Sequence, residues 1–152
     1  MIKINVIVKD KTWLKFIKNP ESYLKSKIKK IQNEKFFGKH KYSFSLKLSN
    51  SREIKYLNKK FRKKNNSTDI LSFPNQTKKK FHELVRFNKE IYLGDIIINS
   101  NKINSSSINL FKKHFNILWI HGLVHLFGYD HKKDKSYKKM NLIEKKFLKK
   151  LS

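Results

Sequence analysis

The chain of 152 residues contains no cysteine. This absence excludes disulfide bonds and thiolate metal sites, so a bound zinc ion would need histidine or carboxylate ligands. Long apolar runs are also missing, because no segment approaches the roughly 20 apolar residues of a transmembrane helix. The N-terminal segment MIKINVIVKD lacks the pattern of a secretory signal peptide. We therefore expect a cytoplasmic protein without a membrane partner.

Alanine is absent as well, and arginine occurs only at Arg52, Arg62 and Arg86. Lysine dominates instead: 37 Lys and Arg residues against 11 Asp and Glu residues give a formal net charge of +26. Such an excess favours a polyanionic partner, and nucleic acid is the usual one. The sequence is also rich in Asn, Ile, Phe and Lys, which AT-rich codons encode, so compositional drift accounts for part of the charge. Composition alone therefore gives only partial support for RNA or DNA binding.

The length of the chain, with no internal repeat and no domain linker, predicts a single domain over residues 1–152. Alternating apolar residues predict strands at 2–8 and 42–48, and largely apolar segments predict strands at 69–73 and 91–98. Helices are expected from Asn19 to about Phe36, from Ser51 to about Arg62, from Asn109 to Phe127, and from about Lys135 to Leu151. Residues 75–90 are interpreted as a flexible polar loop, and residues 99–107 as one helical turn and a loop. Because strands and helices mix without strict alternation, we expect an α/β (α+β-like) fold with a mixed sheet of about four strands.

One histidine motif carries most of the chemical information. The segment HGLVHLFGYDH begins at His121 and contains three of the six histidines. Its spacing is that of a metzincin zinc protease, H-E-x-x-H-x-x-G-x-x-H, with Gly122 in place of the general base. On a helix, His121 and His125 point the same way, and Gly128 permits a left-handed exit that returns His131 as a third ligand. Three protein ligands leave an open metal position, as in catalytic zinc sites.

The missing glutamate disfavours a peptidase, because the proton of a metal-bound water would have no acceptor. Cleavage of a phosphodiester is possible if a cation stabilises the charge that develops on the phosphoryl oxygens. Asp130 is the nearest carboxylate in sequence. It can orient a ligand or act as a base, but capping of the turn explains it equally well.

Several motifs resemble those of the YbeY family of bacterial rRNA maturation factors. HGLVHLFGYDH matches the family signature, and LNKKFRKKNNSTDILSFP (57–74) and LGDIII (93–98) match two further segments. Met140 and Glu144 fall where the last helix of the family carries the same residue types. The resemblance covers most of the chain. Three positions depart from the family pattern: Phe61, Ser67 and Ile117.

The resemblance implies a metal-dependent endoribonuclease, a hydrolase with its metal site at the end of a buried central helix. It implies one zinc ion per chain on His121, His125 and His131. It also implies cleavage of single-stranded RNA in the 3′-end maturation of small-subunit (16S) rRNA and in ribosome quality control, with rRNA and the small ribosomal subunit as partners. The resemblance further implies that Arg62 is an arginine of the cleft. An arginine kept among lysines indicates a need for a planar guanidinium that binds phosphate through two hydrogen bonds.

Two alternatives from other functional classes stay open at the level of sequence. One is a non-catalytic ribosome-assembly factor with a structural zinc and a basic rRNA-binding face. The other is a zinc hydrolase of small substrates, whose charge would reflect drift alone. The remaining histidines are interpreted as ordinary: His40, His82 and His114. The residues expected to build the turn and strand beside the site are Thr68, Asp69 and Ser72.

Overall fold

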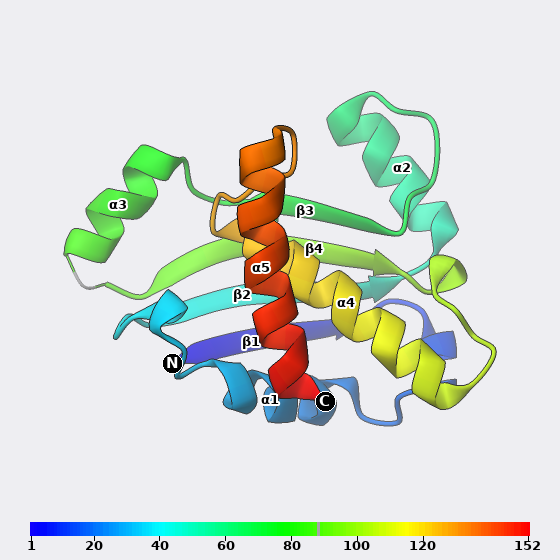
Figure 1. Cartoon of the computed structure of the whole chain (residues 1–152). Helices are drawn as coiled ribbons and strands as arrows, with labels where there is room; N and C mark the ends of the chain where they lie inside the picture. Colours follow the sequence, from blue (N-terminus) through cyan, green and yellow to red (C-terminus); the bar gives the residue numbers. More distant parts are fainter. Residues whose placement is uncertain (88) are drawn as a thin grey trace.

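A computed structural model describes residues 1–87 and 89–152. Its centre is one four-stranded sheet in the order β1-β2-β4-β3. The strands are β1 (Ile2–Val8), β2 (Tyr42–Ser49), β3 (Ile70–Pro74) and β4 (Ile91–Asn99). β1, β2 and β4 are parallel, whereas β3 runs antiparallel to β4 at the edge (Figure 1). The α/β class and the mixed four-stranded sheet expected from the sequence are confirmed.

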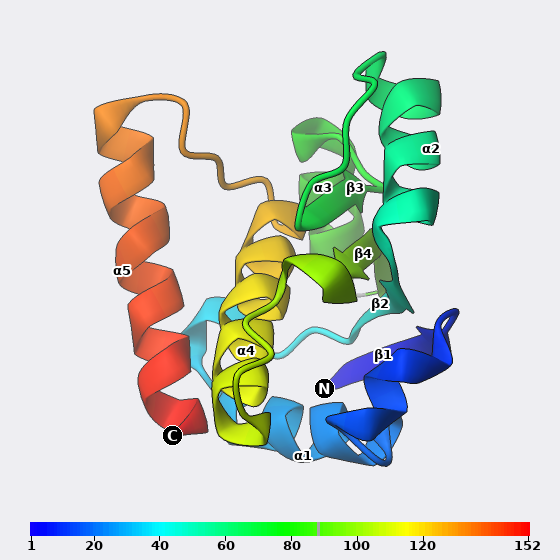
Figure 2. The same cartoon turned by 90° about the vertical axis from the view of Figure 1, so that its right-hand side faces the viewer.

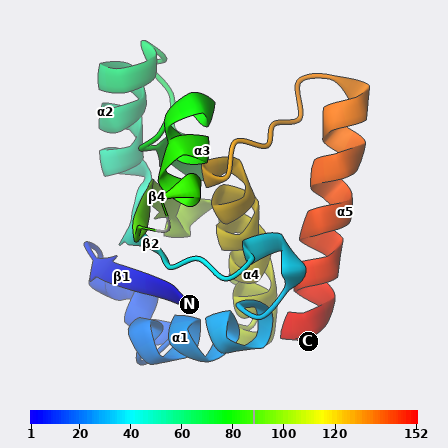
Figure 3. The same ribbon diagram turned by 90° about the vertical axis from the view of Figure 1, so that its left-hand side faces the viewer.

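Helices cover both faces of this sheet. They are α1 (Pro20–Ile31), α2 (Ser51–Arg62), α3 (Lys78–Arg86), α4 (Ile108–Leu126) and α5 (Asp134–Leu151). Three short 3-10 helices are η1 (Lys11–Lys15), η2 (Lys35–Phe37) and η3 (Ser100–Lys102). Figure 2 shows α4 between the sheet and α5, with α2 on the opposite side of the sheet, and Figure 3 shows the same layers from the other end.

The central helix α4 carries the candidate site at its C-terminal end. Ser107 caps its first turn by accepting a hydrogen bond from the Leu110 amide. Toward its end the helix is apolar almost all round, as expected for a helix enclosed by protein. Its buried side chains include Phe111, Phe115, Leu118, Trp119, Ile120, Leu123, Val124 and Leu126. Such burial fixes the helix against the sheet and therefore fixes the direction of its last turn.

Two predictions of local structure were wrong. Residues 78–86 form helix α3, where a flexible loop over residues 75–90 was expected, and residue 88 lies outside the described residues. Thr77 caps α3, and its apolar residues Phe81, Leu84 and Val85 pack on the main core. The second error concerns α1, which ends at Ile31 because a separate 3-10 turn, Lys35–Phe37, follows and buries Phe37.

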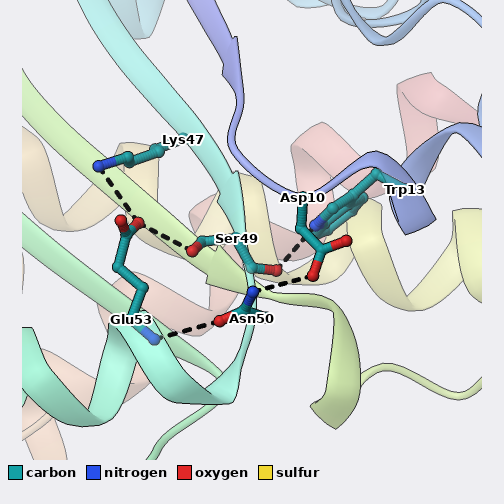
Figure 4. A network of polar contacts seen from close by, with 6 residues as sticks. All are labelled: Asp10, Trp13, Lys47, Ser49, Asn50 and Glu53. Carbon is teal, nitrogen blue, oxygen red and sulfur yellow. Dashed lines mark hydrogen bonds and ion pairs between the residues drawn. The ribbon is translucent and has the colours of Figure 1, made fainter.

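The start of α2 is held by a polar network at the end of β2 (Figure 4). Asn50, and not the expected Ser51, caps the helix: its side chain accepts from the Glu53 amide at 3.1 Å and donates to Asp10 at 2.9 Å. The bond from Asn50 lowers the pKa of the Asp10 carboxyl. The six residues of the network are Asp10, Trp13, Lys47, Ser49, Asn50 and Glu53. This anchoring determines where the other end of α2, which carries Arg62, lies.

The helical spacing of Ile54, Leu57 and Phe61 predicts that all three side chains of α2 face inward, but one of them does not. Ile54 is fully buried and Leu57 is half-buried, as expected, but Phe61 is 59% exposed. Its ring lies 5.6 Å from the ring of Phe73 in an edge-on arrangement. The last turn of α2 extends past the edge of the sheet, so little of the sheet is left for Phe61 to cover.

Candidate metal centre and substrate cleft

Three histidine side chains converge beyond the last turn of α4. One ring nitrogen from each of His121, His125 and His131 lies within 4.8 Å of the others. Gly128 has a φ of +91°, the left-handed region that glycine adopts without strain. This turn returns the chain, so that the His131 ring centroid lies 5.6 Å from that of His121 and 5.2 Å from that of His125. The three histidines are thus close enough to hold one metal ion.

The outer ring nitrogens of two of these histidines are held by hydrogen-bond acceptors. His121 Nδ1 donates to Glu144 Oε1 at 2.7 Å, and His125 Nδ1 donates to the Tyr129 carbonyl oxygen at 2.8 Å. Since a carboxylate and a carbonyl can only accept, both imidazoles carry their proton on Nδ1. In the neutral form of each ring, Nε2 then carries the lone pair that can bind a metal, the arrangement usual for histidine ligands.

The distance between those Nε2 atoms is short enough for both to bind one cation. They lie 3.0 Å apart. Tetrahedral zinc with bonds of about 2.0–2.1 Å separates its nitrogen ligands by roughly 3.3 Å. Burial lowers the pKa of His125, which favours the neutral form that binds metals.

Glu144 is a contact that local sequence reasoning could not assign, because it lies on α5, 23 residues away from His121. We expect Glu144→Ala to lower metal affinity by about 10–100-fold, since the carboxylate orients the imidazole and raises its basicity. Glu144→Gln keeps an acceptor for the Nδ1 proton without the charge, so its loss of affinity should be smaller. Competition with a chromophoric chelator measures both variants.

The matched control for these variants is Glu21→Gln, an exposed glutamate that forms an ion pair with Lys25 in the same helix. It should bind metal like the wild type. Wild-type affinity in Glu144→Ala would show that the carboxylate does not support the site.

The glycine at the position of the protease glutamate has a packing reason. A Cβ on Gly122 would lie 3.0 Å from Ile70 Cδ1 and 3.0 Å from both Cδ1 and Cγ2 of Ile96. Position 122 therefore faces β3 and β4 in the buried layer. A glutamate at this position would point into the sheet and not into the cleft. The absence of the protease base follows from the close approach of α4 to the sheet.

A direct check of this packing is to restore the glutamate. Gly122→Glu should destabilise the protein by about 3 kcal/mol or more, because it overfills a packed layer and buries a carboxyl group. It should also show no peptidase activity. Ile117→Glu is the control on the same helix, because the Ile117 side chain is 42% exposed. The melting temperature of this variant should stay close to that of the wild type. An unchanged melting temperature in Gly122→Glu would contradict the packing argument.

The histidines lie in a cleft of about 610 Å³ that Arg62 also lines. Arg62 Nη2 donates to the Ser72 carbonyl oxygen at 3.0 Å, and its Cζ lies 5.6 Å from the ring centroid of Phe73. These two contacts hold the guanidinium on β3 while its other N–H groups stay available. The structure therefore brings together all four residues that the sequence singled out.

The carboxylates of the cleft take part in local structure. Asp130 accepts a hydrogen bond from the Lys132 amide at 3.2 Å, a contact that lowers the pKa of its carboxyl. This favours the turn-capping interpretation of Asp130. Asp69 accepts from the Thr68 hydroxyl at 3.3 Å beside β3, as expected for residues that build the turn.

Comparison with known proteins agrees with this geometry. The family described as Endoribonuclease YbeY matches residues 8–152. The chain belongs to the YbeY family. It is 44% identical to the Endoribonuclease YbeY of Pelagibacter ubique, over 92% of this chain and 90% of that protein. It is 33% identical to the Endoribonuclease YbeY of Ehrlichia canis, over 99% of this chain and 93% of that protein.

A solved structure supports the fold in the same way. The chain resembles the solution structure of TM1509 from Thermotoga maritima with a TM-score of 0.56 and 27% identity, over 99% of this chain and 89% of that one. Membership of the YbeY family confirms the family resemblance and the expectation of a nuclease enzyme. In the described part of the chain, no helix is long and apolar enough to cross a membrane.

Proposed function

We propose that the protein is a zinc-dependent endoribonuclease that cuts single-stranded RNA, and that His121, His125 and His131 bind the zinc ion. The observation that carries this proposal is the convergence of the ring nitrogens of His121, His125 and His131 in one cleft with a fixed guanidinium. A zinc ion on three imidazoles would lower the pKa of a bound water to about 7 and would act as a Lewis acid toward a phosphoryl oxygen.

Other residues of the chain would bind the phosphate, orient the metal ligands and attract the RNA. Arg62 has N–H groups left over from its bond to Ser72 and can bind the nonbridging oxygens of the phosphate that is cut. Glu144 and the Tyr129 carbonyl hold the imidazoles in orientation. The lysines spread over the surface attract the RNA backbone from a distance, a contribution that is independent of sequence.

The RNA that we propose as substrate is the precursor of small-subunit rRNA near its 3′ end, together with the RNA of defective ribosomes. Support comes from the family name shared by the relatives, from the resemblance of the signature motif and from the net charge of +26. The partner in this proposal is the small ribosomal subunit, and the site of action is the cytoplasm.

The test uses purified protein stripped of metal with a chelator. Single-stranded RNA and a duplex of the same sequence are incubated with the stripped protein and with protein reloaded with zinc, magnesium or manganese. We expect cleavage of the single strand only, restored by zinc. Immature small-subunit particles should then be cut near the 3′ end of their RNA. Equal cleavage by stripped and reloaded protein would overturn the metal dependence, and equal cleavage of the duplex would overturn the strand preference.

A further inference from the structure

A second cavity, of about 490 Å³, lies directly beside the histidine cleft. The two share the turn formed by Gly128, Tyr129 and Asp130, so that this turn is the wall between them. The volume is within the roughly 300–1,000 Å³ of small-molecule sites in proteins. Helix α3, which the sequence did not predict, supplies its outer wall through Phe81 and His82.

Aromatic rings that are fixed by their neighbours line this cavity. Phe81 is half-buried and stacks parallel to Tyr42, with ring centroids 6.3 Å apart and planes inclined by 4°. It also meets Phe127 edge-on at 5.8 Å. Tyr129, which also lines the cavity, packs against Phe36 with ring centroids 5.6 Å apart. Rings that are already held in place lose little freedom when a flat group stacks on them.

Two lysines stand at the rim of the cavity. The Lys78 side chain lies against the turn at Gly128, with its Cε 3.6 Å from the position that a Cβ on Gly128 would take. Lys139 Nζ lies 5.5 Å from the ring centroid of Tyr129. Neither lysine is in a salt bridge with any other residue that the structure describes. Lys78 acts at longer range on the Asp130 carboxyl of the shared turn. Since neither lysine is held in a close ion pair, both can still attract an anion at the rim.

We propose that this cavity binds one unpaired base of the RNA strand, next to the phosphate that lies in the histidine cleft. The inference rests on the proposed function and extends it. A flat aromatic base suits the ring-lined walls, and the flanking backbone phosphate suits the two lysines. A base in a duplex is stacked on both faces and paired at its edge, so it cannot enter. The cavity therefore supplies a physical reason for the preference for single strands.

The charge part of the proposal is tested with two double variants of equal charge. Lys78→Ala with Lys139→Ala removes the rim. Lys79→Ala with Lys138→Ala removes the exposed sequence neighbours on the same two helices, neither of which lines the cavity. We expect the rim variant to raise KM for a short single-stranded RNA by about tenfold, with a much smaller change in kcat. The neighbour variant should change KM by less than about twofold.

The base part is tested with oligonucleotides that lack one base at a chosen position. Removal of the base at one fixed distance from the cut should slow wild-type cleavage by about tenfold, and removal elsewhere should have little effect. Phe81→Leu keeps an apolar side chain against Tyr42 and Phe127 but removes the ring face. This variant should cleave the intact RNA and the RNA without that base at similar rates. Thermal unfolding checks that it is folded.

A crosslinking arm does not depend on cleavage. A non-cleavable single strand carrying 4-thiouridine is irradiated with metal-free protein, and the modified peptides are identified. We expect crosslinks at residues that line this cavity and not the histidine cleft, namely Gln76, Phe81, His82 and Ser136. They should be lost in the rim variant and kept in the neighbour variant.

The outcomes separate the two proposals. If crosslinks form there but no RNA is cut, the base site stands and the nuclease proposal fails. If RNA is cut but crosslinks, abasic effects and the difference between the double variants are all missing, the base site is overturned. Crosslinks spread over the whole basic surface would likewise overturn it, because they would indicate general attraction to the backbone.

Discussion

The His125→Ala variant is expected to lose most of its bound metal and its RNA cleavage while keeping its fold. Two ligands would be left, and His121 Nε2 would lose the ring nitrogen 3.0 Å away with which it could share a metal ion. The drop in metal affinity should exceed the roughly 10–100-fold typical of changes outside the ligand set. Elemental analysis and single-turnover cleavage of a single-stranded RNA measure the two losses.

The fold should survive because the His125 ring lies at the end of α4 and not inside the core. Its contacts are the Tyr129 carbonyl and the other histidines. His114→Ala is the matched control on the same helix, since its ring nitrogen only accepts from the Asn104 amide. It should keep full metal content. Full metal content in His125→Ala would remove that residue from the ligand set, and full cleavage without metal would remove the metal from the reaction.

The parts of this site that the sequence predicts are those determined by neighbouring residues. The four-residue spacing of His121 and His125 and the left-handed turn at Gly128 are local properties of a helix and its exit. They specify that the rings converge before the rest of the fold is known. The alternating strands and the apolar stretch of α4 were predictable for the same reason, since burial of one face or of a whole helix leaves a periodic pattern.

Contacts between distant segments were beyond the reach of local patterns. Nothing near Glu144 indicates that it binds His121, because the pairing depends on how α5 crosses α4 (Figure 1). The sequence shows that Gly122 lacks the carboxylate of a protease, but only the approach of Ile70 and Ile96 gives the reason. Helix α3 was missed because the lysine run before Phe81 resembles a loop, although its residues 81, 84 and 85 have helical spacing.

The structure also ties together the two surfaces on which the proposed reaction depends. The turn after α4 supplies the His125 acceptor through the Tyr129 carbonyl and a wall of the second cavity through the Tyr129 ring. A base that stacks against the Tyr129 ring would contact the same short segment that orients His125. Binding of the base and alignment of the cleft are thus expected to be coupled through Tyr129.

Arg62→Ala should retain the fold and the metal but lose most RNA cleavage, by about 10²–10³ in rate, or 3–4 kcal/mol of transition-state stabilisation. The metal can stabilise one oxygen of the phosphorane, whose charge spreads over several. The guanidinium stands in the same cleft, held by Ser72 and Phe73, and can meet two oxygens at once. Loss of its bond to the Ser72 carbonyl should cost only about 1 kcal/mol of stability.

Arg62→Lys separates charge from geometry. A lysine keeps the positive charge but presents a mobile point charge without the planar fork, so we expect only partial recovery of the rate. Arg52→Ala is the control, because this exposed arginine stands in the first turn of the same helix, far from the cleft end. It should cleave at nearly the wild-type rate. RNA affinity should change far less than rate in the two Arg62 variants, since the other cations of the surface remain. Wild-type cleavage by Arg62→Ala would show that Arg62 is only a surface charge. Loss of metal or unfolding in this variant would show that its role is structural.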